Sequence, residues 1–580
     1  MRTRSRLAVL GALLAATLSG AFALPPDGAA AKEELAPDSL LDSMQAEIRR
    51  ASVKLSKSDP PAYFLSYSAY DGNSVTISAS YGSLLASFEN RFRRAGVIVR
   101  VGSPDLDNTH GQNRRSAIVQ GALPLENDAN ALARSFWWLT NRGYRSSAPA
   151  FLKVKTDTAV RSEEEDKSPD FSLEPPQSHV DTRAPALGLN IPEWQDRLRK
   201  ESAWFREYPE VYDSEILFQD QTSGFRFTST EGSRIAEPSH LVRLVMEAMT
   251  RADDGMELIR VETYQAPQPS DLPSEAKLHA DAEKMAADIK ALRAAPVAEP
   301  FAGPALLSGR AAAVFFHEVV GHRLEGHRQR DEDEGQTFTK KVGQQVMPAF
   351  LSIVDDPTTS TIAGVKLSGS YSFDDEGQPA RRVQLVQDGI LRNFLMSRMP
   401  IKGFSQSNGH GRAQAGLMAT GRQGNLIVTS TNTVKESELR QRLIDEAKKQ
   451  GKPYGLYFED VQGGFTLTQR GLPQAFQVLP VIVWRVYTDG RPDELVRGVD
   501  IVGTPLAALN RIVVTGDTMH VFNGICGAES GSVPVSAAAP GMLFSEIEVQ
   551  KREHSHERPP LLPPPGFDAS GKAKALGGWR

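Results

Sequence analysis

The chain has 580 residues and a formal net charge of −5, with 40% hydrophobic and 24% charged residues. These values are typical of a soluble globular protein with about two to four domains. No basic patch is visible, so the composition argues against nucleic acid as a partner. Cys526 is the only cysteine, which excludes an intramolecular disulfide.

The N-terminus has the pattern of an export signal. Three arginines within the first six residues precede an apolar stretch over residues 7–24, in which Ala21-Phe22-Ala23 forms a small-x-small cleavage site. The stretch is short for a membrane-spanning helix, and two prolines follow it. We therefore predict a cleaved signal peptide over residues 1–23 and a periplasmic or secreted protein with no stable membrane span. An uncleaved N-terminal anchor is the alternative.

Residues 24–300 are expected to form an N-terminal α+β region. Apolar residues from Leu40 to Val53 recur at near-helical spacing. Residues 63–101 have the pattern of strands, with Asp71-Gly72-Asn73 as a hairpin-turn signal. Further helices are predicted over 129–141, 195–205, 240–250 and 274–294, a strand over 215–233, and a polar linker over about 153–190.

Residues 301–552 are expected to form a β-rich C-terminal domain. Strand-length apolar runs alternate there with Gly, Asp and Asn turn signals. A helix is predicted over 436–449, and residues 506–514 resemble a short helix that runs into a strand. The tail over residues 553–580 is rich in Pro and Gly and is predicted to be disordered. The predicted fold class is therefore α+β, with a β-rich domain that carries a metal-binding helix.

That helix ends in the most informative segment of the chain, His317-Glu318-Val319-Val320-Gly321-His322, which follows the apolar run 311–316. Two imidazoles can hold a divalent metal, and a carboxylate beside them can accept a proton from metal-activated water. Only 11 residues of the chain are histidine, and three of them cluster here. The apolar run indicates that His317 points into a partly buried place. Surface histidines without a metal are the alternative.

The spacing of the two histidines restricts the backbone between them. In the common zinc-peptidase helix the histidines are about four residues apart and share one face. Here they are five apart, which rotates the second ring by roughly 140° on a regular helix. Either the helix has a π-type bulge or it ends near His322, where Gly321 can relax the backbone. His322 and His327 are also five apart, so only Glu318 and the apolar run favour the pair with His317.

Cys526 is a candidate third ligand. Gly524 and Gly527 beside it allow the backbone to approach another group closely. A thiolate is a strong zinc ligand, and two histidines with one cysteine leave a fourth position open for water. The alternatives are an inert buried thiol and a cysteine nucleophile with a histidine base.

Several further segments occur in the order and at the separations of a known family. They are Leu324-Glu325-Gly326 after the histidine motif, Gly369-Ser370-Tyr371, Asp374-Asp375-Glu376-Gly377, residues 385–391, Gly524-Ile525-Cys526-Gly527, and Val533-Pro534-Val535 followed by Pro540-Gly541. On these motifs the chain resembles the TldD/PmbA metallopeptidases, over roughly residues 300–550.

The resemblance implies a zinc-dependent peptidase of the catalytic, TldD-like type. His317, His322 and Cys526 would be the Zn²⁺ ligands, and Glu318 the general base. The implied substrate is an unfolded or extended peptide. The implied assembly is a homodimer, or a heterodimer with a TldE/PmbA-like subunit that lacks the metal motif. The chain departs from the family at residues 527–532, where the usual Gly-Lys and Gly-Gln are missing, and in its exported N-terminus.

The residues and the resemblance together predict amide hydrolysis by metal-activated water, with Glu318 as the proton acceptor. His327 or Tyr371 could steady the oxyanion, although a structural role is favoured for each. The turn at residues 374–376 is expected to be a solvated loop rather than a second metal site. A sheet edge beside the metal would hold an extended peptide through main-chain hydrogen bonds.

The alternative function is a non-catalytic, exported binding or assembly subunit with a structural metal site. A glutamate beside the ligands argues against this alternative, because a structural site needs no base and closes its fourth position.

Overall fold

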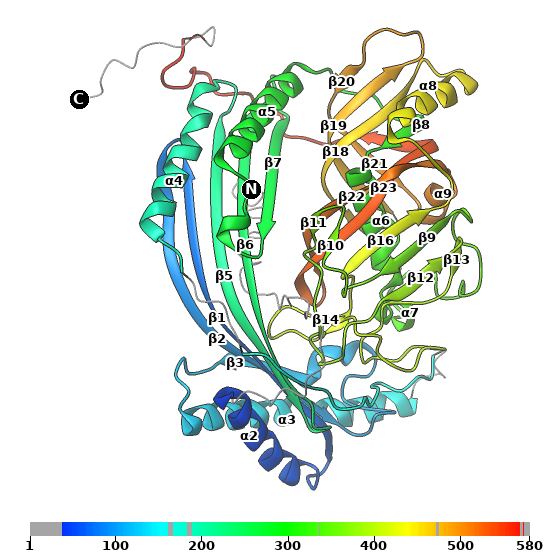
Figure 1. Ribbon diagram of the computed structural model, residues 1–580. Helices are drawn as coiled ribbons and strands as arrows, with labels where there is room; N and C mark the ends of the chain where they lie inside the picture. Colours follow the sequence, from blue (N-terminus) through cyan, green and yellow to red (C-terminus); the bar gives the residue numbers. More distant parts are fainter. Residues whose placement is uncertain are drawn as a thin grey trace.

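The computed structural model describes residues 38–160, 166–182, 188–335, 337–470, 475–568 and 572. It has the expected α+β class, with a curved N-terminal sheet lying beside a C-terminal body that begins at β8 (Figure 1). The predicted signal peptide at residues 1–23 lies outside the described residues. Within the described ranges, no helix has the length and apolar character needed to cross a membrane.

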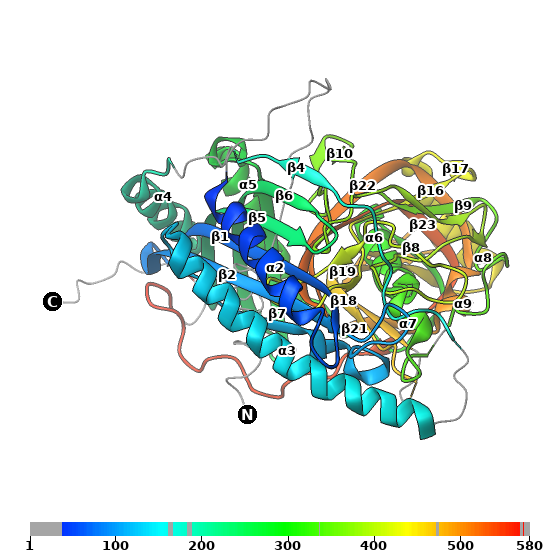
Figure 2. The same cartoon turned by 90° about the horizontal axis from the view of Figure 1, so that it is seen from below.

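The N-terminal body is a seven-stranded sheet with the order β3-β2-β1-β5-β6-β4 and with β7 paired to β6. Its strands are β1 (Ala62–Ser80), β2 (Ser83–Val101), β3 (Ile118–Ala122), β4 (Ser178–Val180), β5 (Asp213–Ser229), β6 (Arg234–Arg251) and β7 (Glu257–Ala266). Its main helices are α2 (Ser39–Leu55), α3 (Ala129–Val160), α4 (Ile191–Ala203) and α5 (Glu275–Ala294). Figure 2 shows α2 and α3 lying across the strands at one end of this sheet.

Residue alternation decides which face of the sheet the helices cover. Val242 and Leu244 of β6 lie in the core that α4 and α5 share with the sheet. Residues between them point to the opposite face, because successive side chains of a strand alternate. That opposite face turns toward the C-terminal body, where Phe225 and Phe227 join a cluster with Ala415.

The hairpin signal at residues 71–73 was wrong. β1 passes straight through this segment, and the chain turns instead at Tyr81-Gly82, where both φ angles are positive (45° and 76°). A Cβ atom on Gly72 would lie 2.6 Å from the carbonyl oxygen of Thr222. Gly72 therefore permits the close approach of two strands rather than a turn.

Two further expectations for this body were wrong. Residues 240–250 belong to β6 and not to a helix, because their apolar residues alternate between a helix-covered face and the face toward the C-terminal body. α3 continues to Val160, so residues 153–160 of the expected linker are helical. The predicted helices at 195–205 and 274–294 are confirmed as α4 and α5.

The C-terminal body is built on a twelve-stranded sheet. Its strands are β8 (Phe301–Leu307), β9 (Leu351–Asp355), β12 (Val383–Gln387), β13 (Ile390–Leu391), β16 (Asn425–Ser430), β17 (Thr433–Val434), β18 (Tyr454–Thr466), β19 (Phe476–Tyr487), β20 (Glu494–Val496), β21 (Val499–Gly503), β22 (Ile512–Ala528) and β23 (Gly531–Lys551). Two small hairpins, β10 (Thr361–Ile362) with β11 (Val365–Lys366) and β14 (Gly411–Arg412) with β15 (Thr420–Gly421), lie outside it. The predicted helix at 436–449 appears as α8 (Leu439–Lys449), and the predicted short helix that runs into a strand at 506–514 appears as α9 (Pro505–Leu509) followed by the start of β22 at Ile512.

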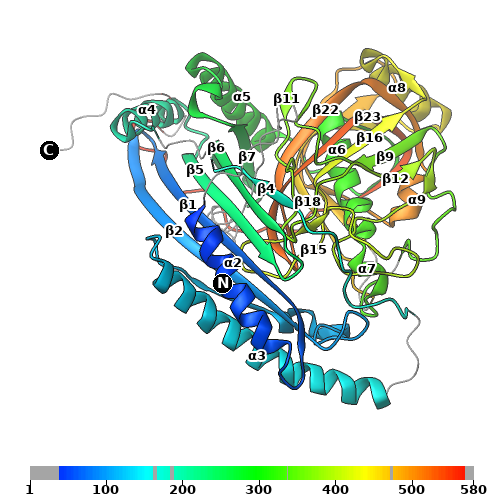
Figure 3. The same cartoon turned by 60° about the horizontal axis from the view of Figure 1, so that its bottom comes forward.

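A closed ring of strands surrounds the helix α6 (Gly309–Val319). β23 pairs with both β21 and β8, and β19 and β18 connect these two strands on the other side. Figure 3 shows α6 inside this ring. The helix is apolar on nearly every side because it is buried on nearly every side. Phe315 contacts Phe476 and Phe544, with ring centroids 5.3 and 5.2 Å apart.

Buried polar contacts join the two bodies. Arg398, 1% exposed, pairs with Glu231 at 2.6 Å, and Arg260 of β7 pairs with Asp460 of β18 at 2.7 Å. The predicted disordered tail also has a described contact, since Glu557 pairs with Arg251 of β6 at 3.0 Å. The two bodies are thus held in a fixed relation on either side of the candidate site.

Candidate metal centre

The end of α6 resolves the spacing of the two histidines. α6 ends at Val319, and a short 3₁₀ turn, η5 (Gly321–Leu324), follows at once. The change of helix type brings the second imidazole back toward the first, so the helix ends rather than bulges. A Cβ atom on Gly321 would lie 1.9 Å from Oε1 of the buried Gln423. Glycine is therefore needed here for space.

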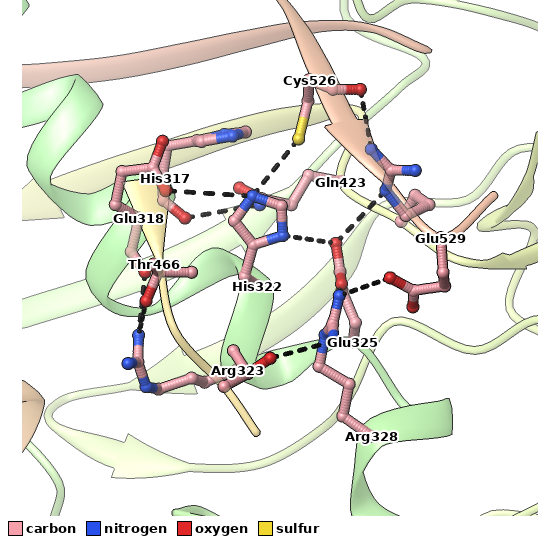
Figure 4. A network of polar contacts seen from close by, with 12 residues as sticks. His317, Glu318, His322, Arg323, Glu325, Arg328, Gln423, Thr466, Cys526 and Glu529 are labelled. Carbon is pink, nitrogen blue, oxygen red and sulfur yellow. Dashed lines mark hydrogen bonds and ion pairs between the residues drawn. The ribbon is translucent and has the colours of Figure 1, made fainter. Parts of the chain in front are cut away.

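The structure brings His317, His322 and Cys526 together (Figure 4). One ligand atom from each lies within 4.8 Å of the others, and the Cys526 Sγ is 3.3 Å from the His322 Nε2. Zinc–nitrogen and zinc–sulfur bonds of about 2.0 and 2.3 Å place tetrahedral ligand atoms about 3.5 Å apart. The three side chains therefore fit one shared ion with small side-chain adjustments.

Nearby cations favour the thiolate form of Cys526. Burial alone would raise the pKa of the thiol, but His322, Arg422 and His317 outweigh burial and hold the pKa well below its usual value. Arg422 also donates a hydrogen bond to the carbonyl oxygen of Cys526 at 2.8 Å. The thiolate is the form that binds a metal, so the site is prepared for a soft divalent cation.

Glu325 orients the His322 ring. Its Oε1 lies 3.1 Å from the His322 Nδ1, which leaves the Nε2 to face Cys526. Arg328 donates to the same carboxylate at 2.8 Å, and the Arg422 guanidinium lies 3.4 Å from it. Metal-binding histidines commonly have a carboxylate in this position. The sequence alone predicted no role for Glu325, although this residue lies within the Leu324-Glu325-Gly326 motif.

Glu318 lies beside the three ligand candidates. Its Oε2 is 4.0 Å from the His322 Nε2. Burial raises the pKa of this carboxyl, and His317 and His322 act in the opposite direction. A Cβ atom on Gly464 of β18 would lie 2.6 Å from the Glu318 Cγ. The backbone of β18 thus confines the carboxylate to the side of the metal candidates.

A cavity of about 1270 Å³ opens over these residues. One wall is the β7 face of the N-terminal sheet, and the other is formed by residues 521–529 of β22 and 460–469 around the end of β18. β22 pairs with β17 only at Thr515 and Gly516. Among the described residues the rest of this edge has no strand partner, and residues 521–528 of β22 line the cavity.

The two candidate oxyanion donors are engaged elsewhere. Tyr371 is buried and donates its hydroxyl to the Gly409 carbonyl at 2.8 Å, and it does not line the cavity. His327 does line the cavity, but its Nε2 is in close contact with the Glu529 carboxylate. His327, Glu325 and Glu529 form a second group with ligand atoms in reach of one another. Arg328 pairs with both of these carboxylates, so this second group already has its cation.

The acidic turn is buried and not solvated, contrary to expectation. Asp374 and Glu376 are 2% and 7% exposed. The backbone N–H of Gly411 donates to Asp374 at 2.8 Å, and that of Arg398 donates to Glu376 at 2.6 Å. Burial raises the pKa of both carboxyls. Hydrogen bonds from backbone N–H groups of distant segments compensate for the loss of water around these carboxylates. The sequence alone does not predict such long-range contacts.

Residues 302–551 match the family described as PmbA/TldA metallopeptidase C-terminal domain. Over this segment, which is less than half of the chain, the protein is similar to the TldD/PmbA family. The Metalloprotease TldD homolog of Haemophilus influenzae is 28% identical over 249 residues, which are 42% of this chain and 48% of that protein. The Zinc metalloprotease TldD homolog of Saccharolobus solfataricus is 25% identical over 247 residues, 42% of this chain and 51% of that protein. The chain thus matches about half the length of these relatives.

Solved structures extend the likeness to the whole fold. TldE from Thermococcus kodakarensis superposes with a TM-score of 0.57 at 12% identity, covering 88% of this chain and all of that one. A protein from Thermotoga maritima, TM0727, gives the same TM-score at 16% identity and covers 87% and 99% of the two chains. At such identities the comparison shows the fold alone, including the N-terminal sheet that lies outside the matched domain.

Proposed function

We propose that this protein is a zinc-dependent peptidase that hydrolyses unfolded or extended peptides. The observation that carries the proposal is the meeting of two imidazoles and one thiol beside a buried glutamate, at the floor of an open cavity. The names of the relatives, metalloprotease and zinc metalloprotease, agree with it.

The donor set fits zinc. Nitrogen and sulfur ligands in a mutually close, buried arrangement are typical of zinc, and three protein ligands leave one position for water or substrate. His317, His322 and Cys526 would hold the ion, with Glu325 fixing the His322 ring. A bound zinc ion supplies Lewis-acid activation of water and of the scissile carbonyl.

Glu318 acts as the proton acceptor in this proposal. Its carboxylate shares the cavity floor with the ligands, and β18 holds it against them. General-base catalysis of this kind contributes about 10²- to 10⁴-fold in rate. A structural metal site needs no such base, which argues against the non-catalytic binding or assembly subunit.

The substrate class follows from the walls of the cavity. Among the described residues, the second edge of β22 has no strand partner over residues 521–528, so an extended peptide can pair with it beside the metal ligands, except at the Cys526 carbonyl that Arg422 occupies. Main-chain recognition accepts many side chains but needs an extended segment with free main-chain groups. Unfolded segments have such groups, whereas folded proteins have already paired theirs. Export by the N-terminal signal, and assembly as a homodimer or with a TldE/PmbA-like subunit, form part of the proposal.

The test is peptide cleavage by the purified mature chain loaded with zinc. Unfolded peptides should be cleaved at internal bonds, as read by mass spectrometry. Glu318→Gln should lose about 10²- to 10⁴-fold in kcat while it still binds zinc. Glu299→Gln, at an exposed position outside the cavity, should keep full activity. Full activity in Glu318→Gln would refute the mechanism.

A further inference from the structure

Arg243 of β6 is a buried cation in the wall of the cavity. It is 7% exposed and lines the same cavity as the metal candidates. Its Nε is fully buried without a hydrogen-bond partner, and among the described residues no hydrogen bond or ion pair to its guanidinium is found. Buried charges in proteins are normally paired, so an unpaired guanidinium here calls for a ligand.

Five of the six other arginines that line this cavity pair with a carboxylate, and the sixth, Arg115, is exposed and donates to the Glu529 carbonyl oxygen. Arg260 and Arg310 share Asp460, at 2.7 and 3.1 Å, and Arg328 pairs with Glu325. Burial alone lowers the pKa of Arg243 to about 10, with no carboxylate acting on it. The side chain therefore remains charged at neutral pH and has no counter-charge from the protein.

Two glutamines extend Arg243 into a row of donors. Gln219 of β5 and Gln265 of β7 lie directly opposite Arg243 in the sheet, so the three side chains share one face. The Gln265 Oε1 accepts a hydrogen bond from the Ser368 hydroxyl, which leaves its Nε2 as a donor. The Nε2 atoms of both glutamines are buried without partners. Of the two glutamines, Gln265 lines the cavity with Arg243, so a guanidinium and an amide donor face it side by side, which suits a carboxylate.

The row lies near the metal candidates along the cavity. Ser368, which contacts Gln265, also donates its backbone N–H to the Asn523 side chain at 3.3 Å. Asn523 precedes Cys526 by three residues of β22, which corresponds to roughly 10 Å of strand.

We propose that Arg243, assisted by Gln265, binds a carboxylate of the peptide substrate, in the same cavity as the metal candidates and away from the scissile bond. The carboxylate belongs either to the C-terminus of the peptide or to an aspartate or glutamate side chain. The inference rests on the proposed function only in taking the cavity as a peptide site. It adds a charge preference to main-chain recognition.

Binding is measured with the Glu318→Gln chain and fluorescent peptides of one neutral sequence. The first peptide has an amidated C-terminus, the second a free C-terminal carboxylate, and the third an internal glutamate with an amidated end. One carboxylate peptide should bind more tightly than the neutral one, and which of the two does so identifies the source. Arg243→Gln should weaken binding of that peptide by about 10- to 100-fold, the range expected for a hydrogen-bonded charge. The neutral peptide should be unaffected.

Arg94→Gln on β2, an exposed arginine outside the cavity, is the matched control and should change no affinity. Arg243→Lys should retain part of the preference. Removing an unpaired buried charge should leave thermal stability unchanged or higher, whereas a structural role would lower it. Equal binding of all three peptides, or an equal loss for all three in Arg243→Gln, would overturn the inference and leave the peptidase proposal standing. Carboxylate-selective binding without any cleavage by the zinc-loaded wild-type chain would uphold this site and refute the peptidase.

Discussion

Glu325→Gln tests how the protein holds the candidate metal centre. The substitution keeps the size of a fully buried side chain but removes its charge. Three contacts are affected: the one with the His322 Nδ1 at 3.1 Å, and those with Arg328 and Arg422 at 2.8 and 3.4 Å. The change therefore acts on the orientation of one ligand and on the pairing of two buried cations.

The structure gives a magnitude for each effect. Burial would raise the pKa of Glu325, but His322, Arg328 and Arg422 hold it at about 2 instead of 4.5. This lowering of the pKa by about 2.5 units corresponds to about 3 kcal/mol of folding stability at neutral pH. Breaking a buried ion pair typically costs a similar amount, about 3–5 kcal/mol. Loss of a carboxylate behind a metal-binding histidine lowers metal affinity by about 10- to 100-fold.

The assay is zinc competition against a chelator, combined with denaturant unfolding of the same sample. Glu334→Gln is the control, since Glu334 also pairs with Arg328 at 2.7 Å but does not contact His322. The control should lose stability without losing zinc affinity. Wild-type zinc affinity in a folded Glu325→Gln chain would refute the role assigned to Glu325.

Two further changes test other parts of the structure. Gly321→Ala should destabilise the chain by about 1–3 kcal/mol and weaken zinc binding, because the new methyl group meets Gln423. Adding Gln423→Ala should restore much of the stability and of the zinc affinity. Purely additive effects in the double mutant would contradict the steric explanation. Burial raises the pKa of Glu237 to about 7, against the Ser372 hydrogen bond. The folded state therefore binds the Glu237 proton more tightly than the unfolded state does. The free energy of unfolding is unaffected by this shift below about pH 4.5 and falls as the pH rises from there through 7. Glu237→Gln should therefore exceed the wild type in unfolding free energy by about 3 kcal/mol at pH 8 and match it near pH 4, and a pH-independent difference would count against the shift.

The sequence predicted the metal-ligand candidates because their signals are local. The histidine motif and the lone cysteine between glycines are each recognisable in a few residues. The backbone between the histidines was open to two solutions, and only the structure shows that α6 ends at Val319. Glu325 was missed because its role depends on a turn that follows the helix.

Long-range strand contacts account for most of what the sequence did not predict. Gly72 lies in a segment whose sequence is typical of a turn, yet in the structure it allows the backbone of β1 to pass close to Thr222 of β5. The burial of residues 374–376 depends on backbone donors from residues 398 and 411. The cavity wall that contains Arg243 comes from a segment predicted as a helix. In each case the deciding contact joins segments far apart in the chain.

The central claim is that His317, His322 and Cys526 bind one zinc ion together. The most direct measurement is the zinc content and zinc affinity of the purified mature chain, beside Cys526→Ser and His317→Ala. We expect about one tightly bound zinc ion per wild-type chain and a large loss of affinity in either variant while the fold persists. A folded wild-type chain that takes up no zinc, or a Cys526→Ser chain that binds it equally tightly, would contradict the account.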